Sequence, residues 1–160
     1  MRLLKIVFAW FPATTVSGVP YVIDGDTLAF GRKRVRLWGI DAPEMDTWQG
    51  RKARAFLIKK LAGREVTCVD TGTRSYGRVV AKCYVDGEDI AWWLVNAGHA
   101  VDWPHYSGGH YRAGTSPQLR RFIIAYRRRQ AHMQRLNWRP SNGDMAVGLL
   151  RSRGRSLWVR

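Results

Sequence analysis

Two short segments near the N-terminus concentrate acids and arginines at the spacing of a β-strand. Asp24 and Asp26 are two residues apart, and Arg34 and Arg36 repeat that spacing. Residues two apart share one face of a strand. Paired carboxylates repel one another unless a cation or proton intervenes, and oxygen ligands favour Ca²⁺ or Mg²⁺. Because a guanidinium can hold two phosphate oxygens, the combination predicts a site for a metal ion and a phosphodiester.

The same residues also have a plainer interpretation. The segment 24–26 is typical of a turn, and Arg34 and Arg36 could form the solvated face of a strand. The residues that follow add Asp41 and Glu44 beside the arginines, in a chain whose net charge is +15. Acids gathered there are hard to explain as solubilising residues, so the second segment favours the site.

Three motifs resemble those of the staphylococcal nuclease family in type, order and separation. They are Asp24-Gly25-Asp26-Thr27, the run from Arg36 to Glu44 that contains Ile40-Asp41-Ala42-Pro43-Glu44, and Tyr76-Gly77-Arg78. Each motif alone would be weak, but three in the correct order are specific. The resemblance covers about residues 19–106. It implies a mainly β fold with packed helices (α+β), namely a five-stranded OB-fold barrel with about three helices, and an enzyme that cleaves DNA and RNA with Ca²⁺ as cofactor.

The resemblance also implies a metal site. By motif position, the carboxylates of Asp26 and Asp41 and the backbone carbonyl of Ala42 match the calcium ligands of the family, and Asp24 matches an acid close to the metal. The family has threonine where this chain has Ala42. A backbone carbonyl is not altered by that difference, so the predicted ligand set is complete.

The remaining motif residues match the catalytic groups of the family. Glu44 would be the general base that takes a proton from water, and Arg36 and Arg78 would stabilise the charge that builds up on phosphorus. The expected reaction is hydrolysis of single-stranded DNA or RNA that frees a 5′-hydroxyl and leaves a 3′-phosphate. The alternative function is a non-catalytic OB-fold module that binds nucleic acid. Acids that repel phosphate would not help a pure binder, so the residues favour the nuclease.

Charge is unevenly distributed along the 160 residues. Residues 111–160 hold 12 of the 27 Lys and Arg residues but only one of the 12 acids, Asp144. A field of this sign attracts polyanions, so nucleic acid is the first partner expected. An anionic membrane surface is the competing partner for the basic tail. No obligate protein partner is predicted, and we expect a monomer.

The pattern of apolar residues, glycines and caps predicts the elements that carry these motifs. Strands are expected at about 18–30, 33–38, 65–70 and 79–85, and helices at about 47–62 and 90–97. Ser116 and Pro117 are typical of a helix start, which predicts a third helix to about Leu136. The resemblance to the family ends after about Tyr111. We expect a nuclease-like OB-fold domain at 18–136 and a basic tail at 137–160. For this tail the alternatives are a disordered segment that binds nucleic acid, a segment attracted to membranes, and the product of a reading-frame change.

The two cysteines are placed symmetrically about a predicted hairpin. Cys68 and Cys83 would face each other across two strands whose midpoint lies between Ser75 and Tyr76. Such a pair can close a disulfide, although two buried thiols are the alternative. Disulfides are typical of exported proteins.

The N-terminus also bears on the compartment. Residues 1–17 have basic residues and a short apolar run, which resemble an atypical or truncated signal. Secretion, or export to a bacterial periplasm, is expected if these residues act as a signal. The alternative is an extra strand or a disordered leader, for which a cytoplasmic location is expected.

Two aromatic residues are candidates for contact with bases. Trp103 and Tyr106 follow the predicted 90–97 helix, and stacking on bases contributes about 1 to 3 kcal/mol per base. Tyr106 lies near a base-stacking tyrosine of the family by motif alignment. Packing in the core is the alternative for both.

Overall fold

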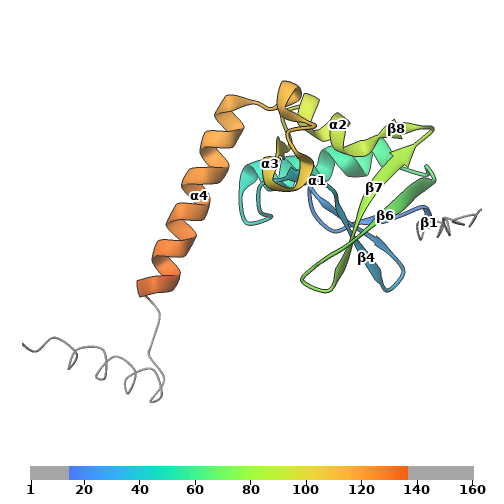
Figure 1. Cartoon of the computed structure of the whole chain (residues 1–160), viewed down its shortest axis with the longest axis horizontal. Coiled ribbons are helices and arrows are strands. Elements are labelled where there is room, and N and C mark those ends of the chain that lie inside the picture. The colour runs from blue at the N-terminus through green and yellow to red at the C-terminus, as the bar shows by residue number, and fades with distance from the viewer. Residues whose placement is uncertain (1–14, 137–160) are drawn as a thin grey trace, which may run out of the picture. The chain divides into compact units, whose positions relative to one another are not determined.

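A computed structural model describes residues 15–136 as an α+β fold (Figure 1). The predicted tail and residues 1–14 of the predicted leader lie outside the described residues. The strands are β1 Thr15–Gly18, β2 Tyr21–Val22, β3 Thr27–Phe30, β4 Lys33–Leu37, β5 Ile40–Asp41, β6 Val66–Ser75, β7 Arg78–Val85, β8 Glu88–Asp89 and β9 Val101–Asp102. The helices are α1 Trp48–Leu61, α2 Ile90–Asn96, α3 Pro104–Ser107, the 3₁₀ turn η1 Arg112–Gly114, and α4 Pro117–Leu136.

Seven strands form the main sheet. Its hydrogen-bonded order is β1-β6-β7-β4-β3-β2, β8 pairs with β7, and β5 and β9 form a separate two-stranded sheet. The pair β4 and β7 is parallel, whereas the other pairs are antiparallel. Within residues 15–136 these pairings do not close the sheet on itself, so the five-stranded barrel stays a prediction.

The single strand expected at 18–30 is wrong, because β1 ends at Gly18 and the chain then forms two short strands, β2 and β3. Gly18 has a φ of 143°, and Pro20 has no backbone N–H to donate to a ladder. The backbone N–H of Asp26 then donates to Asp24 Oδ1 at 2.9 Å, which is the side-chain bond of an Asx turn. Asp24 and Asp26 therefore lie in the turn before β3 rather than on a strand face. Thr15 to Ser17, expected in the leader, belong to β1.

The core lies between the sheet and the helices. Buried Leu28 and Val35 come from the sheet, and Leu57 and Leu61 come from α1. A second, smaller cluster joins Val101 to Leu119 and Ile123 of α4. The chain divides into two compact units between Ile123 and Ile124. None of the helices in the described residues is both long and apolar enough to cross a membrane.

The β6–β7 hairpin confirms the predicted placement of the cysteines. Cys68 is directly opposite Cys83, and the two form a disulfide with their Cα atoms 4.0 Å apart. The register shifts between Asp70 and Arg74, so the turn is centred on Tyr76 and Gly77, one residue beyond the predicted midpoint. Both turn residues have positive φ, 48° and 76°, which suits the tight turn of a hairpin.

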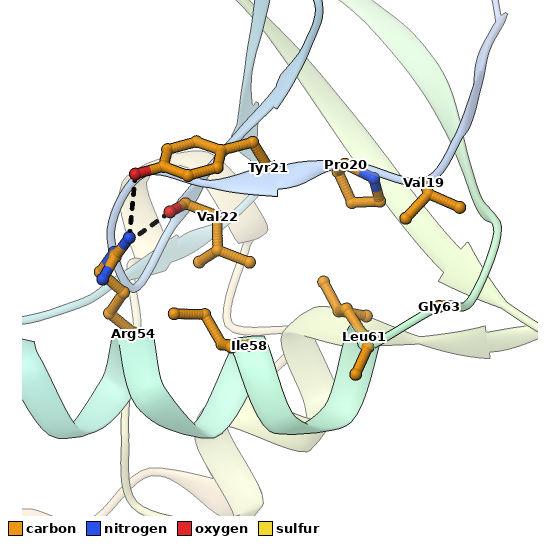
Figure 2. Close-up of a pocket in the computed structure, with 9 residues that line it drawn as sticks. Val19, Pro20, Tyr21, Val22, Arg54, Ile58, Leu61 and Gly63 are labelled. Atoms are coloured by element: carbon orange, nitrogen blue, oxygen red, sulfur yellow. Dashed lines mark hydrogen bonds between the residues drawn. The ribbon is translucent and has the colours of Figure 1, made fainter.

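An apolar hollow of about 260 Å³ lies between the β2 segment and α1 (Figure 2). Its lining includes Val19, Ile58 and Leu61. At one end, Arg54 Nε donates to the carbonyl oxygens of Val22 and Ile23, each at 3.1 Å. This contact fixes α1 against the strand that leads into the Asp24–Asp26 turn. None of the predicted catalytic residues lines the hollow.

Candidate active site

Three neighbouring strands of the main sheet bring the predicted arginines together. Arg36 of β4 is in parallel register with Val80 of β7 and in antiparallel register with Thr27 of β3. Arg78 precedes Val80 by two positions, so Arg78 projects from the same face. The residues around the resulting polar cavity of about 140 Å³ are Asp24, Asp26, Arg36, Ala42, Pro43, Glu44 and Arg78.

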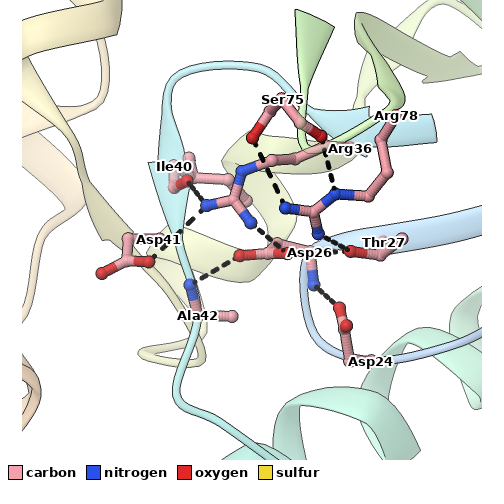
Figure 3. A network of polar contacts seen from close by, with 9 residues as sticks. All are labelled: Asp24, Asp26, Thr27, Arg36, Ile40, Asp41, Ala42, Ser75 and Arg78. Carbon is pink, nitrogen blue, oxygen red and sulfur yellow. Dashed lines mark hydrogen bonds and ion pairs between the residues drawn. The ribbon is translucent and has the colours of Figure 1, made fainter. Parts of the chain in front are cut away.

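Arg36 is held by the two acids predicted to bind metal (Figure 3). Its Nη1 donates to Asp26 Oδ1 at 2.7 Å, and its Nη2 lies 3.6 Å from Asp41 Oδ1. Nη2 also donates to the carbonyl oxygen of Ile40 at 3.3 Å. Only 13% of the Arg36 side chain is exposed, so these contacts hold the guanidinium group in one orientation. A fixed orientation is what a group needs in order to stabilise charge that develops in a transition state.

Asp26 is the most deeply buried of the acids that line the cavity. It accepts hydrogen bonds from Arg36, from Thr27 Oγ1 at 3.1 Å and from the backbone N–H of Ala42 at 3.3 Å. The pKa of Asp26 is raised to about 6, mainly because the carboxyl group is buried; Arg36 lowers this pKa, and the nearby charges of Asp24 and Asp41 raise it. Negative charge is thus crowded at this point of the molecule.

Arg78 approaches the cavity from the neck of the β6–β7 hairpin. Its Nε donates to the carbonyl oxygen of Ser75 at 3.2 Å, and its Nη2 donates to Ser75 Oγ at 3.4 Å. Its Nη1 donates to Thr27 Oγ1 at 3.1 Å, and that hydroxyl donates in turn to Asp26. Thr27 therefore links the second arginine to the buried acid.

Glu44 lies exposed on the loop between β5 and α1, and its backbone is fixed by the first turn of α1. The carbonyl oxygen of Glu44 accepts from Thr47 N at 3.0 Å and from Thr47 Oγ1 at 2.6 Å. Thr47 Oγ1 also accepts from Gly50 N at 3.0 Å, as an N-cap residue does. Arg51 Nη1 donates to the carbonyl oxygen of Asp46 at 3.1 Å. The start of α1 therefore sets the position of the predicted base.

Small residues allow the loops of the site to approach α1. A Cβ on Gly25 would lie 2.7 Å from Ala42 Cβ and 2.8 Å from Ala53 Cβ. A Cβ on Gly50 would lie 2.5 Å from the carbonyl carbon of Glu44 and 2.6 Å from the carbonyl oxygen of Pro43. The acid-bearing turn and the Glu44 loop both depend on these contacts.

The donor chemistry of the site fits a hard divalent cation. The acids Asp24, Asp26 and Glu44 line one cavity, and Asp41 is paired with Arg36 of the same cavity. Across residues 15–136, however, no three acid, histidine or cysteine side chains are grouped so that they could hold a metal. Ca²⁺ takes six to eight oxygens, including waters and backbone carbonyls. A cation would therefore need such additional ligands.

A larger cleft of about 470 Å³ adjoins the cavity and shares Arg36 with it. Trp103 and Tyr106 line this cleft, and the Trp103 ring lies 5.6 Å from the Arg36 guanidinium carbon. The two rings meet edge to face with centroids 4.8 Å apart. The structure therefore places both predicted stacking residues beside the predicted phosphate site.

Sequence reasoning missed three residues of the site. Thr27 and Ser75 hold Arg78, and Tyr76 lines the cleft with 99% of its surface exposed. Thr27 and Tyr76 stand inside the motifs, so their signal was present but had no role attached to it. Ser75 acts mainly through its backbone carbonyl, which leaves no signal in the sequence.

Comparison with known proteins matches residues 34–135 to the family described as staphylococcal nuclease homologue. The succinoglycan biosynthesis protein ExoI of Rhizobium meliloti (strain 1021) is 36% identical over 104 residues, which are 56% of this chain and 53% of that protein. A protein of Escherichia coli named "Uncharacterized endonuclease" is 33% identical over 112 residues, 66% of this chain and 73% of the relative. A probable staphylococcal-like nuclease of Oryza sativa subsp. japonica is 31% identical over 91 residues, 56% of this chain and 24% of the relative.

The fold and the arginine-acid cavity thus occur in a chain that belongs to the staphylococcal nuclease homologue family. The matched region spans about half the length of the Rhizobium relative. The family match also corrects the expected end of the resemblance near Tyr111, because it continues to residue 135. The third helix therefore belongs to the family domain, although its outer face is rich in arginine.

Proposed function

We propose that this protein is a Ca²⁺-dependent nuclease that hydrolyses phosphodiester bonds of single-stranded DNA and RNA. The observation that carries the proposal is the convergence of Arg36, Arg78 and Glu44 with Asp26 on one polar cavity of about 140 Å³. Two fixed guanidinium groups suit a phosphate, and an exposed carboxylate beside them suits a proton acceptor.

The proposed reaction is attack by water on phosphorus. Glu44 accepts a proton from the water as the new P–O bond forms, and the bond between phosphorus and the 5′ oxygen breaks. The leaving oxygen takes up a proton from solvent water to become a 5′-hydroxyl, and the phosphate stays on the 3′ oxygen. Arg36 and Arg78 stabilise the negative charge of the transition state, so loss of either is expected to lower the rate by a factor on the order of 10² to 10³.

A calcium ion would be held by Asp26 and Asp41, with the Ala42 carbonyl as a further ligand and Asp24 nearby. When bound, the ion would withdraw charge from a non-bridging phosphate oxygen. The crowding of negative charge around Asp26 supports a cation there, because Asp24 and Asp41 both raise the pKa of that buried carboxyl. Arg36 would then be shared between the acids and the substrate.

The adjoining cleft is proposed to hold the base next to the cleaved bond. Trp103 and Tyr106 form one aromatic wall, and the exposed ring of Tyr76 lies at the same cleft. Stacking tolerates any base, which suits an enzyme that acts on both DNA and RNA. Arg36 lines both the cavity and the cleft. A base stacked in the cleft would therefore lie close to a phosphate bound by Arg36 in the cavity.

The decisive experiment measures cleavage of single-stranded DNA with Ca²⁺ and with EGTA, for the wild type and for Glu44→Gln. We expect cleavage that requires Ca²⁺ and falls at least about 10²-fold in the variant, with both proteins folded by circular dichroism. Product ends would be assigned by mass spectrometry. Tight binding without cleavage by the folded wild type would support the non-catalytic binding module instead.

We further propose that the protein works in an oxidising compartment, either secreted or periplasmic. The Cys68–Cys83 disulfide joins two buried residues of β6 and β7, and such bonds persist outside the reducing cytosol. Separating the fractions of the native host, followed by thiol labelling, would test this location. A fully reduced pair in a cytosolic fraction would contradict it.

A further inference from the structure

Helix α4 has one apolar face and one strongly basic face. Leu119 and Ile123 are buried against Val101, and Phe122 and Tyr126 are partly buried. At about 100° per residue, these positions lie within one stripe of the helix. The opposite side of α4 is therefore the side that faces away from this packing.

Three exposed arginines follow that opposite side at intervals of seven residues. They are Arg121, Arg128 and Arg135, and we call them the arginine stripe. Seven residues are close to two helical turns, so successive members differ by only about 20° and lie roughly 10.5 Å apart along the axis. Around the helix axis, Arg128 is about 180° from Leu119, the first buried residue of α4.

Nothing in the neighbouring sequence neutralises the arginine stripe. The chain has no acid between Asp102 and Asp144, and α4 has no acid in its first turn. In the part of the chain that the structure describes, the ion pairs involve Arg36, Arg64 and Arg74, not the stripe. A run of exposed like charge costs electrostatic repulsion, which a polyanion would relieve.

We propose that the arginine stripe binds the sugar-phosphate backbone of a nucleic acid strand, as a second contact outside the catalytic cavity. This rests on the proposed function for the identity of the polyanion. The interval of roughly 10.5 Å is larger than the rise of about 3.4 Å per phosphate of one strand in duplex DNA, so each arginine can contact a different phosphate.

Nucleic acid fits the stripe better than an anionic membrane does. A helix that lies in a bilayer surface buries its apolar face among the acyl chains. In α4, Leu119 and Ile123 of that face already pack against Val101 of the protein. Binding through arginine to phosphate needs only the exposed basic side, and Arg is well suited to hold phosphate oxygens.

The test compares the salt dependence of binding to a single-stranded DNA of about 30 nucleotides. All proteins carry Glu44→Gln so that cleavage does not interfere. The stripe variant is Arg121→Gln/Arg128→Gln/Arg135→Gln. The matched control also removes three exposed positive charges, at Arg32, Lys33 and Lys59.

We expect the slope of log K against log salt to fall by about 2 in the stripe variant, because each single-strand phosphate contact contributes about 0.7. The control should change the slope by less than half as much. A variant with lysine in place of the three stripe arginines keeps the positive charges, so its slope should stay close to that of the wild type. Equal loss in stripe variant and control would overturn the proposal. So would an unchanged slope combined with loss of binding to vesicles that contain phosphatidylserine.

A second readout separates this proposal from the proposed function. With Glu44 intact, cleavage of a dinucleotide substrate should be the same for the stripe variant and the wild type, since the one phosphodiester of a dinucleotide is the bond to be cleaved and no other phosphate remains for the stripe. If the wild type cleaves DNA but the stripe variant binds DNA as the wild type does, only the proposal about the stripe is refuted. If the stripe variant binds DNA more weakly but the wild type cleaves no substrate, only the proposed nuclease function is refuted.

Discussion

Replacement of Gly50 by alanine tests whether α1 positions the predicted base. Gly50 is the third residue of α1 and is buried. In an ordinary helix, alanine is more favourable than glycine by about 1 kcal/mol. Propensity alone therefore predicts that Gly50→Ala stabilises the protein and leaves its activity intact.

The contacts at Gly50 predict the opposite for activity. The added Cβ would lie 2.5 Å from the carbonyl carbon of Glu44, whereas carbon atoms in contact lie about 3.5 to 4.0 Å apart. The Glu44 backbone must therefore move by about 1 Å. A misplacement of that size can cost about 10²-fold in rate. Overpacking costs about 1 to 3 kcal/mol, so after the propensity gain we expect a loss of stability of only about 0 to 2 kcal/mol.

The assay pairs the initial rate of single-stranded DNA cleavage at saturating Ca²⁺ with a urea unfolding curve. Gln49→Ala is the matched control, because it introduces the same side chain one residue earlier in the same turn. The hydrogen bonds that fix the Glu44 loop come from Thr47, Gly50 and Arg51, and none of them involves Gln49. We therefore expect the rate of Gln49→Ala to stay within about twofold of the wild type. A Gly50→Ala protein that is both more stable and fully active would refute the positioning of Glu44 by α1.

Three further outcomes are expected from the described contacts. Replacing Cys68 and Cys83 by serine removes a link across 15 residues and should lower the free energy of unfolding by about 3 kcal/mol in a urea titration; an unchanged midpoint would show that the hairpin needs no crosslink. The hydrogen bonds from Arg74 lower the pKa of Asp70, so this pair adds stability above the ordinary carboxyl pKa of about 3.9 and loses it as pH falls through the lowered value. Arg74→Gln should therefore reduce the melting temperature at pH 7 but not in strong acid, and an equal reduction at both would contradict the pairing. Tyr111→Phe removes a 2.7 Å hydrogen bond to a carboxylate and should cost about 1.5 to 3 kcal/mol of unfolding free energy by calorimetry; a neutral effect would mean that water replaces the hydroxyl.

The parts of the fold that follow from local patterns could be predicted from sequence. The helix at 117–136 matches α4 because Ser116 and Pro117 mark its start and its apolar residues have helical spacing. Cys68 and Cys83 were placed opposite each other by their symmetry about the hairpin, which the register confirms. Such features depend on neighbours in sequence, where spacing and propensity are informative.

Two features of the site were not predicted correctly. At Asp24 and Asp26 the local signal allowed both a strand and a turn, and the bond from the backbone N–H of Asp26 to Asp24 forms the turn. The second feature depends on a contact between two segments of the fold, α1 and the loop before it. The close approach of Gly50 to the Glu44 backbone arises from packing of α1, and a glycine in a helix gives no sign of which segment it meets. For the site, the motifs indicated Arg36, Glu44 and Arg78 as one group, but the cleft that adjoins their cavity at Arg36 became visible only in three dimensions.

The parallel pairing of β4 with β7 has a consequence for how the molecule folds. Arg36 and Val80 are neighbours in that pair although 44 residues separate them in sequence. Chain closure of such length is entropically costly and slow compared with formation of a hairpin or a helix. The two arginines that we propose to bind phosphate, Arg36 and Arg78, therefore become adjacent only once this long-range pair has formed. A nascent chain that ends before β7 would carry the acids and Arg36 but no second arginine, so phosphate affinity would report completion of the sheet.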